Sequence, residues 1–170
     1  MSNPAADCRT LLLSQYAILG LFGHHVLVML DAAGQVVGEL NGLATSRGGR
    51  IKPVGYLPCD RLKVHSFNRP YLFQSQQRQA VLVRGCREQV EPLWRAALAG
   101  AEAINARHLA YPILGLGKNS NSVASTLLAC MGLAEPDVTP GLWAPGRGYC
   151  VLTEQTIAAI RAACSVRLSV

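Results

Sequence analysis

Aromatic and charged residues are both scarce in this sequence, and each shortage excludes a class of protein. Only 6% of the 170 residues are aromatic, which is too few to predict a platform on which nucleic-acid bases stack. Charged residues make up 15% and hydrophobic residues 50%, so the chain is not a charged disordered tail. We expect a single domain covering residues 1–170, with a sizeable buried core.

Lysine is also rare. Thirteen of the sixteen basic residues are Arg, and with ten acidic residues the formal net charge is +6. Such a balance suits anionic partners. The basic residues are scattered along the chain, however, so we do not expect a nucleic-acid partner.

The six cysteines lack any C-x-x-C pair. Their wide, irregular spacing excludes the usual zinc ribbons and argues against a disulfide framework. We therefore interpret them as reduced thiols that mainly fill the core. The sequence predicts neither a metal nor a cofactor site.

No uninterrupted hydrophobic run is long enough to predict a transmembrane helix. The most apolar stretch, residues 11–30, contains two adjacent histidines and several other polar or glycine residues. Asp7 precedes this stretch, and no small-residue cleavage site follows its apolar part, so a secretory signal peptide is not predicted either. We expect a soluble protein that is cytoplasmic in the cell that produces it.

The pattern of hydrophobic residues predicts strands first and helices afterwards, which is the order of an α+β fold. The predicted strands are residues 10–21, 24–30, 36–43, 61–67 and 79–84, with a hairpin turn at 31–34 and a short further strand at 149–152. Helices are predicted over 87–108, from a cap at Asn119 to Gly132, and from a cap at Thr153 through Cys164. The expected architecture is an antiparallel sheet of N-terminal strands packed against C-terminal helices.

The segment from Gly115 to Ser120 superficially resembles a phosphate-binding loop. The Walker pattern needs a glycine where Pro112 stands and a Ser or Thr where Asn119 follows Lys118, so triphosphate binding is excluded. The same segment opens a helix, whose first N–H groups stabilise a negative charge or an oxyanion. Taken alone, residues 119–122 are either ordinary capping residues or the start of a reactive site.

The predicted hairpin brings a histidine next to an amide. A four-residue turn at 31–34 pairs residues 30 and 35, and counting back two by two places His24 opposite Asn41. Asn41 would then hold the imidazole of His24 in one tautomer, the orienting role in a nucleophile–base–orienter triad. His25 would point to the other face of the sheet.

These three segments together resemble the circularly permuted papain-like proteins, namely the permuted NlpC-type hydrolases and the relatives of lecithin retinol acyltransferase. Their first motif, a histidine leading into an apolar strand, is similar to GHHVLV at 23–28. A polar residue on the next strand is similar to ELNGL at 39–43, and the Asn-nucleophile pair that opens a helix is similar to NSNSVA at 119–124. The last motif also resembles an uncharacterised bacterial branch with Asn-Ser-Asn-Ser.

The resemblance implies a hydrolase or acyltransferase that acts on an amide or ester bond of peptidoglycan or lipid. His24 would take a proton from Ser120, Asn41 would orient His24, and backbone N–H groups near Ser120 would bind the oxyanion. The partner would be a small-molecule or cell-envelope substrate, whose anionic head group would meet the loop around Arg47 and Arg50. Export as a bacterial effector or toxin is a further implication.

The sequence departs from the family at the nucleophile, because Ser120 stands where the family has cysteine. Three readings are open. Ser120 acts as a serine nucleophile with His24, or Cys130 or Cys150 enters the site, or the domain is a catalytically inactive papain-like binding module. The sequence alone does not choose among them.

Overall fold

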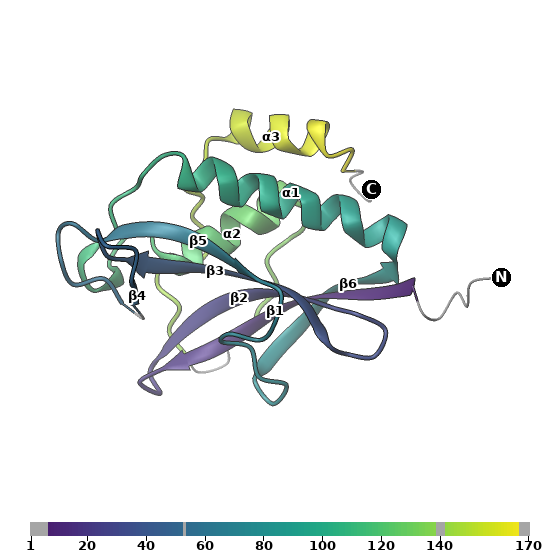
Figure 1. Ribbon diagram of the computed structural model, residues 1–170, viewed down its shortest axis with the longest axis horizontal. Coiled ribbons are helices and arrows are strands. Elements are labelled where there is room, and N and C mark those ends of the chain that lie inside the picture. Colours follow the sequence, from purple (N-terminus) through teal and green to yellow (C-terminus); the bar gives the residue numbers. More distant parts are fainter. Residues whose placement is uncertain (1–6, 53, 139–141, 167–170) are drawn as a thin grey trace.

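The computed structural model describes residues 7–52, 54–138 and 142–166. It is an α+β protein whose strands precede its three α-helices, as the hydrophobic pattern predicts (Figure 1). The strands are β1 (Cys8–Ile18), β2 (Phe22–Leu30), β3 (Val36–Thr45), β4 (Ile51–Lys52), β5 (Arg61–Phe67) and β6 (Arg78–Cys86). The helices are α1 (Arg87–Asn105), the short 3₁₀ helix η2 (Ile113–Gly115), α2 (Ser120–Cys130) and α3 (Glu154–Ala163).

All six strands are antiparallel, in the order β4-β3-β2-β1-β6, and β5 also pairs with β3. Strand β3 pairs with β2 through residues 36–40, with β4 through 44–45 and with β5 through 39–45. Because the β5 pairing overlaps both others, β5 occupies one edge of β3 while β2 and β4 share the other. Between the last β2 pair and the first β4 pair, that shared edge is open and the sheet splits.

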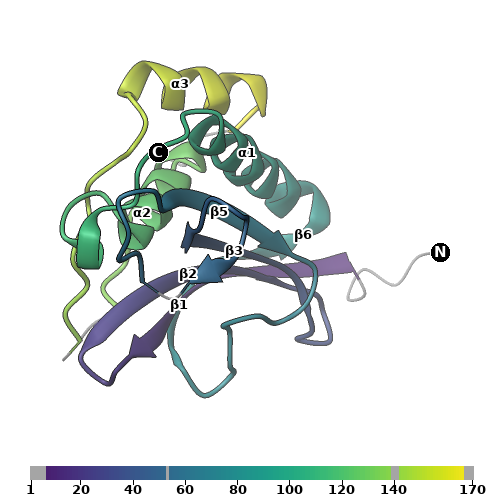
Figure 2. The same ribbon diagram turned by 60° about the vertical axis from the view of Figure 1, so that its left-hand side comes forward.

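The helices cover one face of the sheet, with α3 outermost (Figures 1 and 2). Side chains alternate along the strands, so that Leu11 and Leu13 join the core beneath α1 and α2, while Leu12 lies in a smaller cluster on the opposite face with Val26 and Val28. Leu27 follows the first pattern and faces the helices. His25 therefore shares a face with Leu27, and His24 shares the opposite face with Val26.

Two predictions about local structure are wrong. The two-residue strand β4 lies inside the segment predicted to be a loop, and residues 149–152 do not form a strand. Their backbone is bonded by a helix side chain instead, since the N–H of Val151 donates to Oγ1 of Thr126 at 2.9 Å. The apolar stretch 11–30 forms most of two paired strands, and none of the helices among the described residues is long and apolar enough to cross a membrane.

The register of the β2–β3 hairpin also differs from the prediction. Leu30 pairs with Val36 rather than with Gln35, and an irregularity next to Met29 shifts the ladder once more, so that Leu27 pairs with Leu40. The loop contains residues 31–35, closed by a hydrogen bond from the N–H of Asp31 to the carbonyl of Gln35 at 2.9 Å. Continued by one residue, this register sets Asn41 opposite residue 26, so the predicted direct pairing of His24 with Asn41 is incorrect.

Candidate functional site

The first turn of α2 is bonded to β2 at the point where the sheet splits. The Asn121 side chain accepts a hydrogen bond from the N–H of His25 at 2.9 Å and donates to the carbonyl of Gly23 at 2.9 Å. These two backbone groups flank His24. Both groups lie on the edge of β2 that faces away from β1. The pairing of β2 with β3 ends at Leu27, so the Asn121 side chain bonds these two groups in place of β3. The first turn of α2, which contains Ser120, is thereby fixed beside the backbone of His24.

The cap of α2 is held equally firmly. The side chain of Asn119 accepts from the N–H of Asn121 at 2.8 Å and donates to the carbonyls of Gly115 and Pro145 at 2.7 and 2.9 Å. Gly146 packs against this cap with a φ of +81°, and a Cβ there would lie 2.5 Å from Oδ1 of Asn119. The predicted cap at Asn119 is confirmed, and it fixes where the unpaired N–H groups of the first turn point.

His24 and Asn41 are brought together despite the changed register. Oδ1 of Asn41 lies 3.2 Å from Nε2 of His24, and both residues are buried. The observed register differs from the predicted one by two positions, which keeps both residues on the same face of the sheet. His24 and Asn41 are therefore diagonal neighbours across β2 and β3. The neighbouring Gly42 lets α2 approach β3, because a Cβ there would lie 2.7 Å from Cβ of Val123.

Glu39, two residues before Asn41 on the same face, determines how the amide is turned. Its Oε1 accepts a hydrogen bond from Nδ2 of Asn41 at 2.6 Å. The carboxylate also accepts backbone N–H groups from the segment that follows β5, namely Tyr71, Leu72 and Phe73. A carboxylate is only an acceptor, so Asn41 must present its NH₂ to Glu39 and its carbonyl oxygen to His24.

This chain of bonds determines the tautomer of His24. Since Oδ1 of Asn41 can only accept, Nε2 of His24 carries the proton and Nδ1 carries the lone pair. Nδ1 is buried and has no hydrogen-bond partner among the described residues. Burial, reinforced by the nearby His25, lowers the pKa of His24 to about 4 although the bond to Asn41 acts in the opposite direction. At neutral pH, His24 is therefore an uncharged base with a free lone pair.

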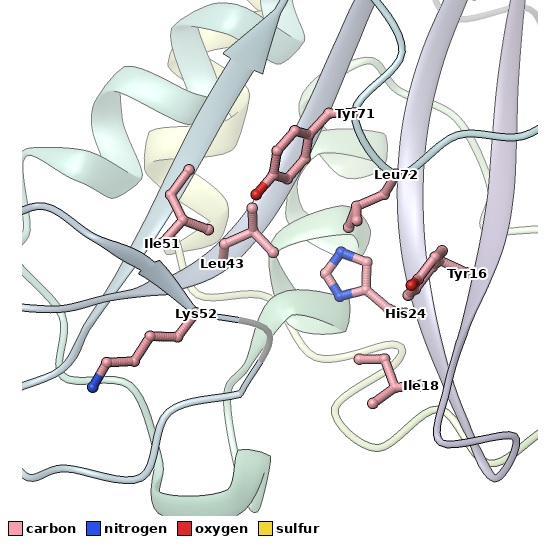
Figure 3. A pocket seen from close by; sticks show the side chains of 8 residues that line it. All are labelled: Tyr16, Ile18, His24, Leu43, Ile51, Lys52, Tyr71 and Leu72. Atoms are coloured by element: carbon pink, nitrogen blue, oxygen red, sulfur yellow. The ribbon is translucent and has the colours of Figure 1, made fainter.

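His24 borders a cavity of about 240 Å³ on the side of the sheet away from the helices (Figure 3). Its other walls are mostly apolar and aromatic: Tyr16, Ile18, Leu43, Ile51, Lys52, Tyr71 and Leu72. Figure 3 shows the Lys52 side chain extending away from the imidazole. Nζ of Lys52 is bonded to both carboxylate oxygens of Asp60, at 2.8 and 3.0 Å, so the cavity has no isolated charge beside His24.

Ser120 is the first residue of α2, and its side chain is bonded to neither His24 nor Asn41. It interacts with the phenol of Tyr111 instead. Burial raises the pKa of Tyr111, and the hydrogen bond with Ser120 opposes that shift. Ser120 is 7% exposed. Of the three predicted site residues, the structure therefore joins two by a hydrogen bond, and it places the third on the first turn of α2, which Asn121 bonds to the backbone on either side of His24.

His25 points to the opposite face from His24, as predicted, and contacts a second polar group. Its Nδ1 lies 3.1 Å from Oε1 of Glu135 and its Nε2 lies 3.4 Å from Nε2 of Gln15. Burial alone would raise the pKa of Glu135, but hydrogen bonds from His25 and Ser125 outweigh it and the pKa is lowered. This group joins β2 to the segment after α2, on the helix side of the sheet.

The two cysteines that the sequence offers as alternative nucleophiles, Cys130 and Cys150, lie in or against the hydrophobic core. Cys130 is the last residue of α2 and fully buried, and burial raises its pKa to about 11, so it stays a protonated thiol at neutral pH. Cys150 is half-buried and packs against the main core. Within the described residues, no three His, Cys, Asp or Glu side chains are grouped so as to hold a metal ion.

Sequence reasoning did not assign roles to Glu39, Asn121 or Tyr111. Glu39 was visible as an acidic residue on a buried strand, two positions from Asn41 and therefore on the same face. Asn121 and Tyr111 carried no such signal, because their contacts join segments that are distant in sequence. Comparison with protein-family models, with curated proteins and with solved structures finds no match to this chain.

Proposed function

We propose that the protein is a hydrolase or acyltransferase that acts on an amide or ester bond, with Ser120 as nucleophile and His24 as general base. The observation that carries the proposal is the buried Nδ1 of His24, which has no hydrogen-bond partner among the described residues although the bonds to Asn41 and Glu39 leave this nitrogen unprotonated. Unpaired buried polar atoms are rare in folded proteins, and a functional role is one of their recognised causes. The permuted papain-like scaffold is part of this proposal.

In the proposed reaction, the Ser120 hydroxyl exchanges its contact with Tyr111 for Nδ1 of His24 and gives its proton to that nitrogen. The serine oxygen then attacks the carbonyl carbon of the substrate. The N–H of Ser120, the one first-turn N–H that the Asn119 cap does not engage, stabilises the resulting oxyanion.

The tetrahedral intermediate collapses when His24 returns the proton to the departing amine or alcohol. An acyl group then remains as an ester on Ser120. Water releases it in a hydrolase, and a second alcohol or amine takes it in an acyltransferase. His24 assists this second step by accepting the proton of the incoming group. The cavity next to His24 is mostly apolar, and its charged wall residue, Lys52, is paired with Asp60, which suits the acyl part of a lipid or peptidoglycan-derived substrate.

The test is hydrolysis of nitrophenyl esters and anilides by the wild type and by Ser120→Ala and His24→Gln. We expect each variant to lose about a thousandfold in kcat/KM, as in other nucleophile–base pairs. Ser125→Ala is the matched control, because it removes a hydroxyl from the same helix that is engaged with Glu135 instead. Ser120→Cys should retain or gain activity. Equal, robust turnover by wild type, Ser120→Ala and His24→Gln would refute the assignment.

One observation favours a second candidate, a papain-like binding module without catalysis. The Ser120 hydroxyl is engaged with Tyr111, and His24 is only 1% exposed. Under this alternative, the bonds among Glu39, Asn41 and His24 hold β3, β2 and the segment after β5 together for stability alone. An absence of ester or amide turnover and of covalent labelling at Ser120, in a folded protein, would establish it.

A further inference from the structure

Large hydrophobic side chains are exposed on the loops around the first turn of α2. We call six of them the leucine rim: Leu19, Leu21, Ile113, Leu114, Leu116 and Trp143. The turn between β1 and β2 carries two of these residues, and η2 with the residue after it carries three. In both Figure 1 and Figure 2, the β1–β2 turn and η2 lie at the same end of the molecule.

Hydrogen bonds connect the loops that carry the leucine rim. Trp143 donates its N–H to the carbonyl of Leu21 at 3.2 Å and accepts from the N–H of Gly23 at 2.9 Å, and its ring lies 5.6 Å from that of Phe22. Two residues further on, the carbonyl of Pro145 accepts from Asn119, whose side chain also bonds the last residue of η2. The rim thus extends from the β1–β2 turn past the start of α2 to η2.

Two of the rim leucines are in a backbone conformation that does not favour leucine. Leu19 has a φ of +54° and is 85% exposed, and Leu114 has a φ of +56° and is 66% exposed. Glycine or asparagine adopts this left-handed conformation at lower cost, and a polar residue is better solvated there. Neither leucine is compensated by burial, so the stability of the fold does not explain why leucine stands at these two turns.

The exposed charged side chains on the loop before β4 and after η2 are positive, whereas the segment after α2 also carries exposed Asp137, which is paired with Arg147. Arg47 and Arg50 are exposed in the turn that leads into β4, and Lys118 is exposed just after the rim residue Leu116. The loop after β4 contacts η2 through the N–H of Leu114 and the carbonyl of Gly55, at 3.0 Å. In sequence, residues 18–23, 46–60 and 112–119 contain a single acidic residue, Asp60, which is buried and bonded to Lys52.

We propose that the leucine rim inserts into the surface of an anionic lipid bilayer, with Arg47, Arg50 and Lys118 against the head groups. Exposed apolar side chains beside basic ones match the interfacial region, where apolar burial and attraction to anionic lipid act together. A second copy of the chain is a poorer partner, because the basic residues beside its leucine rim would face the same basic residues of the first copy. The inference is independent of whether Ser120 reacts.

Co-sedimentation with vesicles tests this inference. The full chain is mixed with vesicles of phosphatidylcholine alone or of phosphatidylcholine with phosphatidylglycerol, and the bound fraction is measured. We expect binding to the anionic vesicles, weakened about tenfold by each of Leu19→Asn and Leu114→Asn because each removes a leucine that inserts into the bilayer. Arg47→Gln and Arg50→Gln should each weaken it about fivefold. Val81→Asn, an exposed apolar residue outside the rim, is the matched control and should bind like the wild type.

Thermal unfolding accompanies each binding measurement. Asparagine suits a positive φ, so Leu19→Asn and Leu114→Asn should unfold at or above the wild-type temperature, and any loss of binding is then a loss of contact with lipid. The arginine variants change only exposed side chains and give a second, independent readout. The inference is overturned if the wild type does not bind anionic vesicles, if the rim variants bind as tightly as the wild type, or if they instead abolish a concentration-dependent dimer.

Discussion

Oδ1 of Asn41 lies 3.2 Å from Nε2 of His24, although the two residues are diagonal rather than opposite across β2 and β3. The bond matters because of what it leaves on the other side of the ring. With Nε2 engaged as a donor, Nδ1 is an unprotonated nitrogen, buried and without a partner among the described residues. In the proposed mechanism, Asn41 is therefore a positioning residue that acts through His24.

Replacing Asn41 by alanine should reduce turnover by releasing the imidazole. We expect kcat on an ester substrate to fall about a hundredfold with KM nearly unchanged, because misorientation of a base affects the transition state rather than binding. Thr45→Val is the matched control, since it removes the 2.9 Å contact to a different histidine, His65, from the same strand. An equal fall in kcat/KM in both variants would indicate a general loss of structure instead.

Buried His24 should make the protein less stable in acid. Its pKa is near 6.5 in the unfolded chain and about 4 in the native protein, so between these pH values only the unfolded chain binds the proton. The contribution of uncharged His24 to the free energy of unfolding is complete above pH 6.5. As the pH falls, this contribution decreases by about 1.4 kcal/mol per pH unit until about pH 4.

Urea unfolding of wild type and His24→Gln across this pH range measures that contribution. Glutamine does not titrate, so the difference in unfolding free energy between the two proteins should change with pH in that window. His108→Asn, which removes an exposed imidazole, is the control and should leave the wild-type pH dependence intact. Parallel curves for wild type and His24→Gln would contradict the lowered pKa.

Asn121→Asp should loosen the start of α2. Aspartate still accepts from the N–H of His25 but loses the donors to Gly23 and Pro145, whose carbonyls would then face a carboxylate. Asn105→Asp makes the same chemical change in another helix-to-strand bond, to the backbone of Val64.

We expect both variants to unfold at lower temperature and only Asn121→Asp to lose ester turnover, because Asn121, unlike Asn105, bonds the turn that contains Ser120 to the backbone on either side of His24. Activity is measured well below each unfolding temperature. If Asn105→Asp lost turnover to the same extent, the effect of Asn121 would be one of stability alone.

Tyr111→Phe should release the Ser120 hydroxyl. In the proposed mechanism the phenol competes with His24 for that hydroxyl, so its removal should raise the rate at which Ser120 is acylated. Burst-phase measurement of nitrophenol release gives this rate directly. A slower burst would show that Tyr111 assists the reaction and does not restrain the nucleophile.

The sequence predicted the order of elements and the His24–Asn41 contact, but the contact came from a wrong register. The period of a strand is two, so an error of two positions keeps the same face and preserves a diagonal neighbour. The helix caps at Asn119 and Thr153 were predictable because side-chain capping is a local property. The split in the sheet was not predictable. At the split, Asn121 bonds backbone groups of β2 that are 96 and 98 residues away in sequence.

The contact between Ser120 and Tyr111 escaped sequence analysis for a similar reason. Tyr111 follows α1 and is held by the bond from its N–H to the carbonyl of Asp60 at 2.9 Å, and nothing in the local pattern indicates that its ring reaches α2. Such contacts depend on how loops close over the core. The chemistry of the residue types could be predicted from the sequence, whereas the hydrogen-bond partner of the Ser120 hydroxyl could not.

The central claim, that His24 activates Ser120, is tested most directly by covalent labelling with a fluorophosphonate followed by peptide mapping in a mass spectrometer. The account predicts an adduct on Ser120 in the wild type, and its loss in folded His24→Gln. It would be contradicted by a folded wild-type protein in which Ser120 stays unmodified, or by His24→Gln reacting at Ser120 as fast as the wild type.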